Sequence, residues 1–206
     1  MYFVKTPLWA KKVFNRYTWQ INTENRELYL TFDDGPHPVA TPFVLEQLDR
    51  FGAKASFFCL GKNVMAHQDI YREILKRGHS VGNHTHNHLN GWKVKHDDYI
   101  KNVEEAILHI DSLLFRPPYG RITRKAGKSL MQKGFRVIMW DVLSGDFDIN
   151  IKPERCTANV IKNAVKGSVI VFHDSEKAFK NVTYTLPRVL EYFSQKGYIF
   201  KGLTDN

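Results

Sequence analysis

The alternation of two hydrophobic periods along the chain restricts its fold more than any other feature. Short apolar runs typical of strands alternate with longer segments in which apolar residues recur at helical spacing. Strands that alternate with helices form βα units, which build a largely parallel sheet. About seven units follow one another without a charged linker or low-complexity segment, so we predict one α/β domain. The expected helices span 41–51, 69–77, 97–114 (the longest), 123–133, 153–165 and 183–196, and the expected strands include 55–60, 80–83, 135–140 and 168–172.

Two adjacent carboxylates end the first strand. Asp33 and Asp34 follow the alternating run 28–32, and Gly35-Pro36 breaks the strand at once. Successive strand residues point to opposite sides, so the two carboxylates cannot share one simple environment. They are costly to bury unless a cation or a metal ion receives at least one of them. Taken alone, the pair is more typical of a solvated Asp-Asp-Gly turn.

A histidine cluster follows another expected strand. His84 and His88 are four residues apart, with His86 between them. Two imidazoles and one carboxylate are a recurrent catalytic zinc set, which leaves one position open for water or substrate. An exposed loop or a capping arrangement would explain the histidines alone. Combined with Asp33 and Asp34, they predict a His-His-Asp metal site whose second carboxylate is free to act as a base.

Charge and cysteine content exclude several classes of function. The 30 Lys and Arg residues against 21 Asp and Glu give a net charge of +9, but no run of five basic residues occurs. A basic surface alone is nonspecific, so we predict no nucleic-acid partner. Cys59 and Cys156 fit no metal-ligand spacing, and Cys59 lies in an apolar run that predicts a buried thiol.

The first twenty residues contain no apolar stretch of the roughly 7–15 residues typical of a secretory signal. The chain also has no run near the roughly 18 apolar residues that a membrane-spanning helix requires. Leu8, Trp9, Val13 and Phe14 can form one face of a short basic helix, which would pack across the bottom of the domain or lie weakly on a membrane surface. These patterns favour a cytoplasmic or membrane-peripheral location.

Four segments, in this order, resemble the motifs of the polysaccharide deacetylase family, also called carbohydrate esterase family 4 or the chitooligosaccharide deacetylase homology domain. They are Thr31–Pro36, His84-Thr85 with His88, Arg116–Gly120 and Val169–Asp174. The resemblance extends from about residue 28 to 203, and the ordered set is highly specific. It implies a distorted (β/α)7 barrel as a single catalytic domain, residues 28–206, with residues 1–27 as an extension packed on the barrel.

The resemblance also implies a metal centre. By it, Asp34, His84 and His88 bind one divalent ion, with zinc expected and cobalt, nickel or manganese as alternatives. Such an ion polarises a carbonyl group and lowers the pKa of bound water toward about 7.

The same resemblance supplies the remaining catalytic roles. Asp33 is the general base, and Arg116 keeps it ionised and oriented. The backbone N–H of Tyr119 helps to hold the oxyanion. His173 is the general acid, and Asp146 pairs with it and raises its pKa. Each residue has a plainer explanation in isolation, such as surface exposure, packing or capping, but together these explanations require four coincidences.

One motif departs from the family pattern. Where members commonly carry Asp-Ser-x-Asp-Trp, this chain has residues 143–147, Leu-Ser-Gly-Asp-Phe. The second aspartate is retained as Asp146, whereas Leu143 replaces the first and Phe147 replaces the tryptophan. The catalytic groups are therefore present, but the wall that faces the sugar differs.

The expected activity is metal-dependent hydrolysis that removes acetyl groups from N-acetylated sugars of a peptidoglycan- or chitin-type glycan. An O-acetyl esterase or a deacylase of another acylated sugar is an alternative, as is a weakly active carbohydrate-binding module with the same fold. The expected partner is an acetylated glycan or oligosaccharide, which places the substrate in the cell envelope. The sequence does not specify an oligomeric state.

Overall fold

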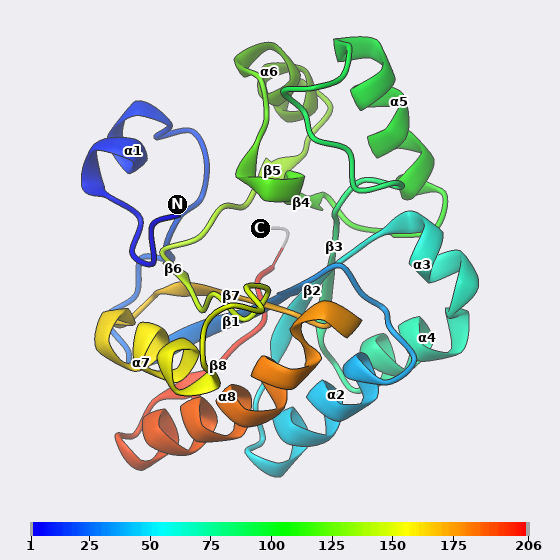
Figure 1. Cartoon of the computed structure of the whole chain (residues 1–206). Helices are drawn as coiled ribbons and strands as arrows, with labels where there is room; N and C mark the ends of the chain where they lie inside the picture. Colours follow the sequence, from blue (N-terminus) through cyan, green and yellow to red (C-terminus); the bar gives the residue numbers. More distant parts are fainter. Residues whose placement is uncertain (1, 205–206) are drawn as a thin grey trace.

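Parallel strands form one curled sheet in the computed structural model, which describes residues 2–204 (Figure 1). The strand order is β5-β4-β3-β2-β1-β7-β6, and β8 pairs with β1 beside this path. The seven ordered strands form a curled half-barrel, which confirms the predicted single α/β domain and its distorted (β/α)7 barrel. The strands are β1 (Glu27–Asp33), β2 (Ala55–Cys59), β3 (Ser80–Asn83), β4 (Leu114–Phe115), β5 (Arg136–Val137), β6 (Val142–Leu143), β7 (Val169–His173) and β8 (Ile199–Phe200).

Helices surround the sheet, with α2, α7 and α8 together on one side, at the bottom of Figure 1. None of the helices within residues 2–204 has both the length and the apolar character needed to cross a bilayer. The helices are α1 (Leu8–Val13), α2 (Ala40–Arg50), α3 (Gly61–Ala66), α4 (Gln68–Lys76), α5 (His96–Ile107), α6 (Arg124–Gln132), α7 (Pro153–Asn163) and α8 (Glu176–Gln195), with a 3-10 turn η1 (Pro118–Gly120).

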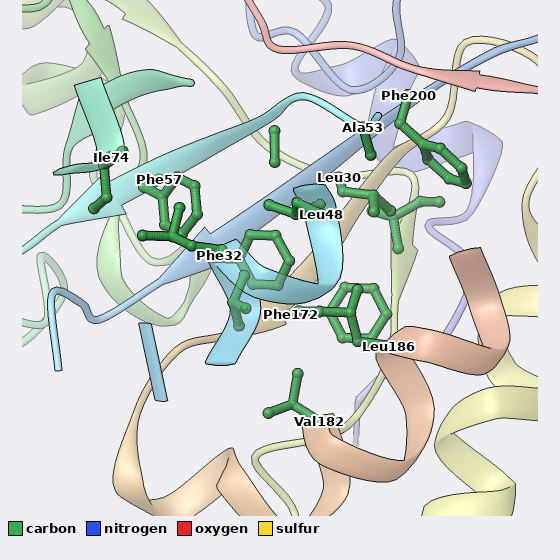
Figure 2. Close-up of a cluster of buried hydrophobic side chains, with 14 of the residues drawn as sticks. Leu30, Phe32, Leu48, Ala53, Phe57, Ile74, Phe172, Val182, Leu186 and Phe200 are labelled. Atoms are coloured by element: carbon green, nitrogen blue, oxygen red, sulfur yellow. The ribbon is translucent and has the colours of Figure 1, made fainter. Parts of the chain in front are cut away.

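Strand β1 is buried along its whole length, as expected for a central parallel strand covered on both faces. Leu30 and Phe32 belong to the main apolar core, which also contains Leu48 of α2 and Leu186 of α8 (Figure 2). The alternate residue Thr31 lies on the opposite face, where its hydroxyl contacts a buried arginine side chain. The period-2 pattern therefore packs one face of β1 against helices and turns the other toward the barrel interior.

The prediction of a helix over 97–114 is wrong at its C-terminal end. Helix α5 ends at Ile107, and Leu114 begins β4 instead. Ile110 is buried, and its spacing from α5 imitates another helical turn. However, Ser112 accepts a hydrogen bond from the Leu114 N–H, a local contact typical of turns. The longest helix is α8, which has 20 residues and begins well before the predicted residue 183.

The N-terminal segment, residues 2–21, covers the opening between the two edge strands of the half-barrel. Val4 accepts a hydrogen bond from Leu143 of β6, while Thr18 donates to Val137 of β5 and accepts from Met139. These contacts satisfy backbone groups that an open sheet edge would leave unpaired. The exposed side chains of α1, including Trp9, show that this helix does not use its apolar residues to cover the bottom of the barrel.

A buried carboxylate attaches this segment to the barrel. Asp141 is fully buried and lies 2.6 Å from Lys5 Nζ and 2.5 Å from Lys11 Nζ, and it also accepts the Ser168 hydroxyl at 2.5 Å. Burial disfavours ionisation, but the two lysines outweigh it and lower the pKa of Asp141. Two cations at one buried carboxylate make it the main polar attachment of residues 5–11.

We expect Asp141→Ala to destabilise the protein by about 1–3 kcal/mol, because it removes the buried carboxylate that two partly exposed ammonium groups share, and Lys5 keeps only the Asn163 carbonyl as an acceptor. Urea unfolding measures this loss, and limited proteolysis should show earlier cleavage within residues 2–21. The control is Glu24→Gln, which removes an exposed partner of Lys166 and should leave the unfolding midpoint unchanged. Equal midpoints for the two variants would contradict the attachment.

Candidate metal centre and active site

Three side chains that could hold a metal ion meet at the carboxyl ends of the central strands. Asp34 follows β1, while His84 and His88 follow β3. Asp34 Oδ1 lies 3.2 Å from His88 Nε2 and 3.8 Å from His84 Nε2. This oxygen is buried and has no hydrogen-bond partner among the described residues. A buried, unsatisfied carboxylate oxygen facing two imidazole nitrogens fits a divalent cation.

The opposite nitrogens of both imidazoles are already engaged. His84 Nδ1 donates to the Arg116 carbonyl oxygen at 2.8 Å, and His88 Nδ1 lies 3.0 Å from the Tyr119 hydroxyl. Such contacts orient metal-binding histidines and leave Nε2 for the ion. Burial lowers the pKa of His84 to about 4, so its ring is neutral, as a ligand must be. Together with Asp34, the set supplies two nitrogens and one oxygen.

The neighbouring carboxylate has a different environment. Asp33 Oδ1 accepts a hydrogen bond from Arg116 Nη1 at 2.7 Å, while its Oδ2 lies 4.0 Å from His84 Nε2. Arg116 is fully buried and also donates to the Thr31 hydroxyl and to the Ile138 and Met139 carbonyls. The predicted arginine is therefore a core side chain, not a surface one. It holds one oxygen of Asp33 in place and leaves the other facing His84.

His173 lies beside Asp33 in the sheet, because the two are register partners on β1 and β7. Its Nδ1 is 2.8 Å from Asp146 Oδ1, and its backbone N–H donates to Asp146 Oδ2 at 2.7 Å. Burial alone would lower the pKa of His173, but the Asp146 carboxylate raises it to about 9. The imidazole is therefore protonated at neutral pH.

Backbone strain concentrates at this site. Within residues 2–204, the non-glycine residues with positive φ are Asp34 (83°), Thr85 (66°), His88 (58°) and Tyr119 (60°). This left-handed conformation is unusual for most residues and a marked outlier for a β-branched threonine. Thr85 is held there by the Asn83 side chain, which accepts its N–H at 2.8 Å. Such strain persists where the surroundings determine it and clusters at functional sites.

The sequence left Asp174 without a role, but the structure places it directly beneath the metal-site loop. Its Oδ1 accepts the Gly35 N–H at 3.0 Å, and its Oδ2 accepts the Thr41 hydroxyl at 2.6 Å. Burial, with help from the Asp34 charge, raises the pKa of Asp174 to about 8. A Cβ at Gly35 would lie 2.0 Å from this carboxyl group, so only glycine fits. Asp174 therefore positions the turn that follows Asp34.

Three other polar or aromatic side chains near these motifs lie outside the cluster. His86 Nε2 is 3.5 Å from a Glu105 carboxylate oxygen, on the α5 side. His37 Nδ1 accepts backbone N–H groups of residues 39 and 40 at the start of α2. Trp92 donates its indole N–H to the Ile122 carbonyl. None of the three joins the metal-site side chains.

The cluster opens into a cavity of about 620 Å³. Asp33, Asp34 and His173 line it, and Leu143 and Phe147 form an apolar part of the wall. The Phe147 ring lies 5.2 Å from the His173 ring, between centroids. A potential base, an acid and a metal-binding set thus face one space large enough for a sugar residue. This arrangement can activate water on one side of a carbonyl group and protonate a leaving group on the other.

Comparisons with known proteins agree with this chemistry. A family model described as polysaccharide deacetylase matches residues 20–138. A peptidoglycan-N-acetylglucosamine deacetylase of Bacillus cereus is 32% identical over 196 residues, covering 91% of each chain. A chitooligosaccharide deacetylase of Azorhizobium caulinodans is 32% identical, covering 75% of this chain and 77% of that one. The crystal structure of a peptidoglycan N-acetylglucosamine deacetylase, in complex with 4-naphthalen-1-yl-N-oxidanyl-benzamide, superposes with a TM-score of 0.88 at 29% identity and covers 96% of this chain and 95% of that one.

Proposed function

Because this chain belongs to the polysaccharide deacetylase family, we propose that it removes acetyl groups from N-acetylated sugars of a peptidoglycan- or chitin-type glycan, using one divalent metal ion. The observation that carries this proposal is the meeting of Asp34, His84 and His88 beside a base and an acid held on neighbouring strands. The deacetylase activities named for its relatives support the substrate class. Such a substrate would place the protein at the cell envelope.

The donor set of Asp34, His84 and His88 suits zinc, and cobalt, nickel and manganese are the alternatives for the same position. When bound there, the ion would polarise the substrate carbonyl and lower the pKa of a water molecule. The buried Asp34 oxygen would gain a partner that the residues described in the structure do not provide.

The chain's own residues perform the proton transfers. Asp33, fixed by Arg116, accepts a proton from the attacking water. The backbone N–H of Tyr119 donates to the oxyanion that forms on the former carbonyl. His173, kept protonated by Asp146, donates its proton to the departing amine. The base and the acid thus lie on neighbouring strands, one placed to receive a proton and the other to give one.

The decisive experiment incubates the zinc-loaded protein with a panel of acetylated glycans and follows acetyl loss by mass spectrometry. The panel should contain peptidoglycan fragments, chitin oligomers and O-acetylated polysaccharides, because the O-acetyl esterase is the alternative activity. We expect each N-acetylated sugar to become lighter by the mass difference between an acetyl group and the hydrogen that replaces it. Loss from O-acetylated members alone would favour the esterase, and no loss from any member would favour a binding module.

Leu143→Asp is expected to change which acetylated substrates are accepted more than it changes turnover of a small activated acetate ester. Leu143 contributes an apolar part of the cavity wall, so a carboxylate there should alter contacts with a sugar but not with a small ester. We expect the ratio of kcat/KM values for two glycans to change by about 10-fold or more. Leu108→Asp, on a side chain that is 78% exposed, is the matched control. A uniform effect on all substrates would contradict a role in specificity.

A further inference from the structure

A second cavity, of about 320 Å³, opens beside the catalytic one. The N-terminal segment contributes Phe3, Trp9 and Phe14 to its lining, and the barrel contributes Met139 and others. We call this cavity the aromatic groove.

The groove adjoins the catalytic cavity. Tyr2, Tyr119, Trp140 and Leu143 line both spaces. Tyr119 also contacts His88 through its hydroxyl, so one end of the groove lies beside the metal-binding set. A group held in the groove can therefore belong to the same molecule that occupies the catalytic cavity.

Several polar groups of the lining already have partners within the protein. The Tyr2 hydroxyl donates to Asp148, and the Thr6 hydroxyl donates to the Trp140 carbonyl. The indole N–H of Trp19 donates to the Phe14 carbonyl.

Trp92 is engaged in the same way, through the Ile122 carbonyl. The groove therefore presents mainly carbon. A sugar hydroxyl placed against these carbon surfaces would lose water without gaining an equivalent partner, whereas an apolar group would lose nothing.

Large aromatic side chains are left in water around this groove. Phe3 is 63% exposed, Trp9 61% and Trp92 64%. Single exposed apolar residues are ordinary, but a contiguous apolar surface next to a catalytic cavity marks a binding surface. The N-terminal segment is also fixed to the barrel through Asp141, so its aromatic side chains are presented on a preorganised support.

We propose that the aromatic groove binds an apolar group carried by the substrate, an alkyl chain or an aryl ring attached to the acylated sugar in the catalytic cavity. This inference rests on the proposed function and narrows its substrate class. A cavity of about 150 Å³ accepts one benzene molecule, so the groove has room for about two rings or a chain of similar volume. The apolar group is attached either through the glycosidic oxygen of the acetylated sugar or through the acyl carbon, in which case the group removed is a longer acyl chain than acetyl.

Tryptophan fluorescence can report occupation of the groove directly, because all four tryptophans of the chain line it. The full-length Asp33→Asn variant, which should turn substrate over slowly, is titrated with two series of ligands. One series contains the methyl, hexyl and phenyl β-glycosides of N-acetylglucosamine. The other contains N-acetyl, N-butanoyl and N-hexanoyl glucosamine. Calorimetry on the same samples gives Kd independently of the optical signal.

We expect Kd to fall by about 10-fold or more along one series, because each buried methylene is worth about four-fold in affinity. The series that responds identifies the point of attachment. Trp9→Ala and Phe3→Ala should reduce the ratio of Kd values between the methyl and hexyl compounds, or between the acetyl and hexanoyl compounds, to about three-fold or less. Leu108→Ala, which alters an exposed apolar side chain outside the groove lining, should preserve the ratio.

Equal affinities along both series would overturn the proposal, as would a ratio that both groove variants leave intact. These results are distinct from a failure of the proposed function, since binding is measured without turnover. If the protein deacetylates unsubstituted oligosaccharides but binds all members of each series with equal Kd, the groove proposal is refuted and the proposed function is retained. If Trp9→Ala reduces the ratio of Kd values but the protein deacetylates no member of the glycan panel, the groove proposal is supported and the deacetylase function is refuted.

Discussion

Asp33→Asn is expected to lower turnover of an acetylated glycan by about 10²–10⁴-fold while leaving affinity for a divalent ion nearly unchanged. Asp33 lies beside the metal-binding set but is anchored by Arg116, with 2.7 Å between Asp33 Oδ1 and Arg116 Nη1. Asparagine keeps an oxygen that can accept this hydrogen bond but cannot accept a proton from water. Titration of the metal-free protein with zinc, followed by turnover assays on the same preparation, separates the two effects.

His84→Ala is the contrasting variant, because it should lose both zinc affinity and turnover. Its Nε2 is 3.8 Å from Asp34 Oδ1, inside the metal-binding set. If Asp33→Asn and His84→Ala lost zinc affinity equally, the roles of Asp33 and Asp34 would have to be exchanged.

Stability must be followed alongside, because Arg116 is a buried cation that loses its charged partner in Asp33→Asn. Arg116 keeps the Thr31 hydroxyl and two backbone carbonyls as acceptors, so we expect the variant to fold. For a chain of this size, each kcal/mol of lost stability lowers Tm by about 2–4 °C. Thermal unfolding therefore shows whether lost turnover comes from unfolding or from the missing base.

The sequence predicted the parts of the fold and site that depend on local pattern. The buried run ending at Asp33 and Asp34 indicated a central strand that ends in two carboxylates, and the predicted parallel topology places the ends of distant strands side by side. The left-handed conformation of Asp34, with φ of 83°, has no such local signal. It depends in part on Asp174, which holds the next residue, Gly35, from 139 positions away.

Features determined by long-range contacts were not predictable in the same way. Strand β6 has two residues, Val142 and Leu143, and is defined by pairing with β7 and by its contacts with residues 4 and 5. No hydrophobic period can reveal so short an element. Asp141 likewise gave no local indication of its role, because its partners Lys5 and Lys11 lie more than a hundred residues earlier.

The prediction of helix over 97–114 failed for a related reason. Ile110 and Leu114 continue the apolar spacing of α5, yet Leu114 pairs with Arg136 of β5 as part of the sheet. The burial of Ile110 and Leu114 was therefore predicted correctly, but their apolar spacing runs from helix α5 into strand β4. A short parallel strand can follow a helix without interrupting its apolar pattern. Only the pairing of that strand in the sheet distinguishes this arrangement from a longer helix.

Asp146→Asn is expected to move the alkaline limb of the pH–rate profile to lower pH by about 1–3 units. The Asp146 carboxylate holds the pKa of His173 near 9, so the acid is protonated below that pH and activity falls as pH rises through it. The charge of the Asp34 carboxylate also raises the His173 pKa. A metal ion held by Asp34 would offset that charge, so we expect the alkaline limb of the wild-type profile at or below pH 9. Asparagine removes the Asp146 charge, so burial then lowers the His173 pKa and the proton is lost earlier.

The leaving group provides an internal control for this prediction. An amine must be protonated as it departs, whereas the leaving group of an activated acetate ester departs unaided. Asp146→Asn should therefore shift the limb for an acetylated glycan more than for the ester, with profiles measured from pH 5 to 10. Asp69→Asn, the same change at an exposed position of α4, should leave both profiles in place. An alkaline limb that does not move in Asp146→Asn, despite the 2.8 Å contact with His173, would mean that another group supplies the proton.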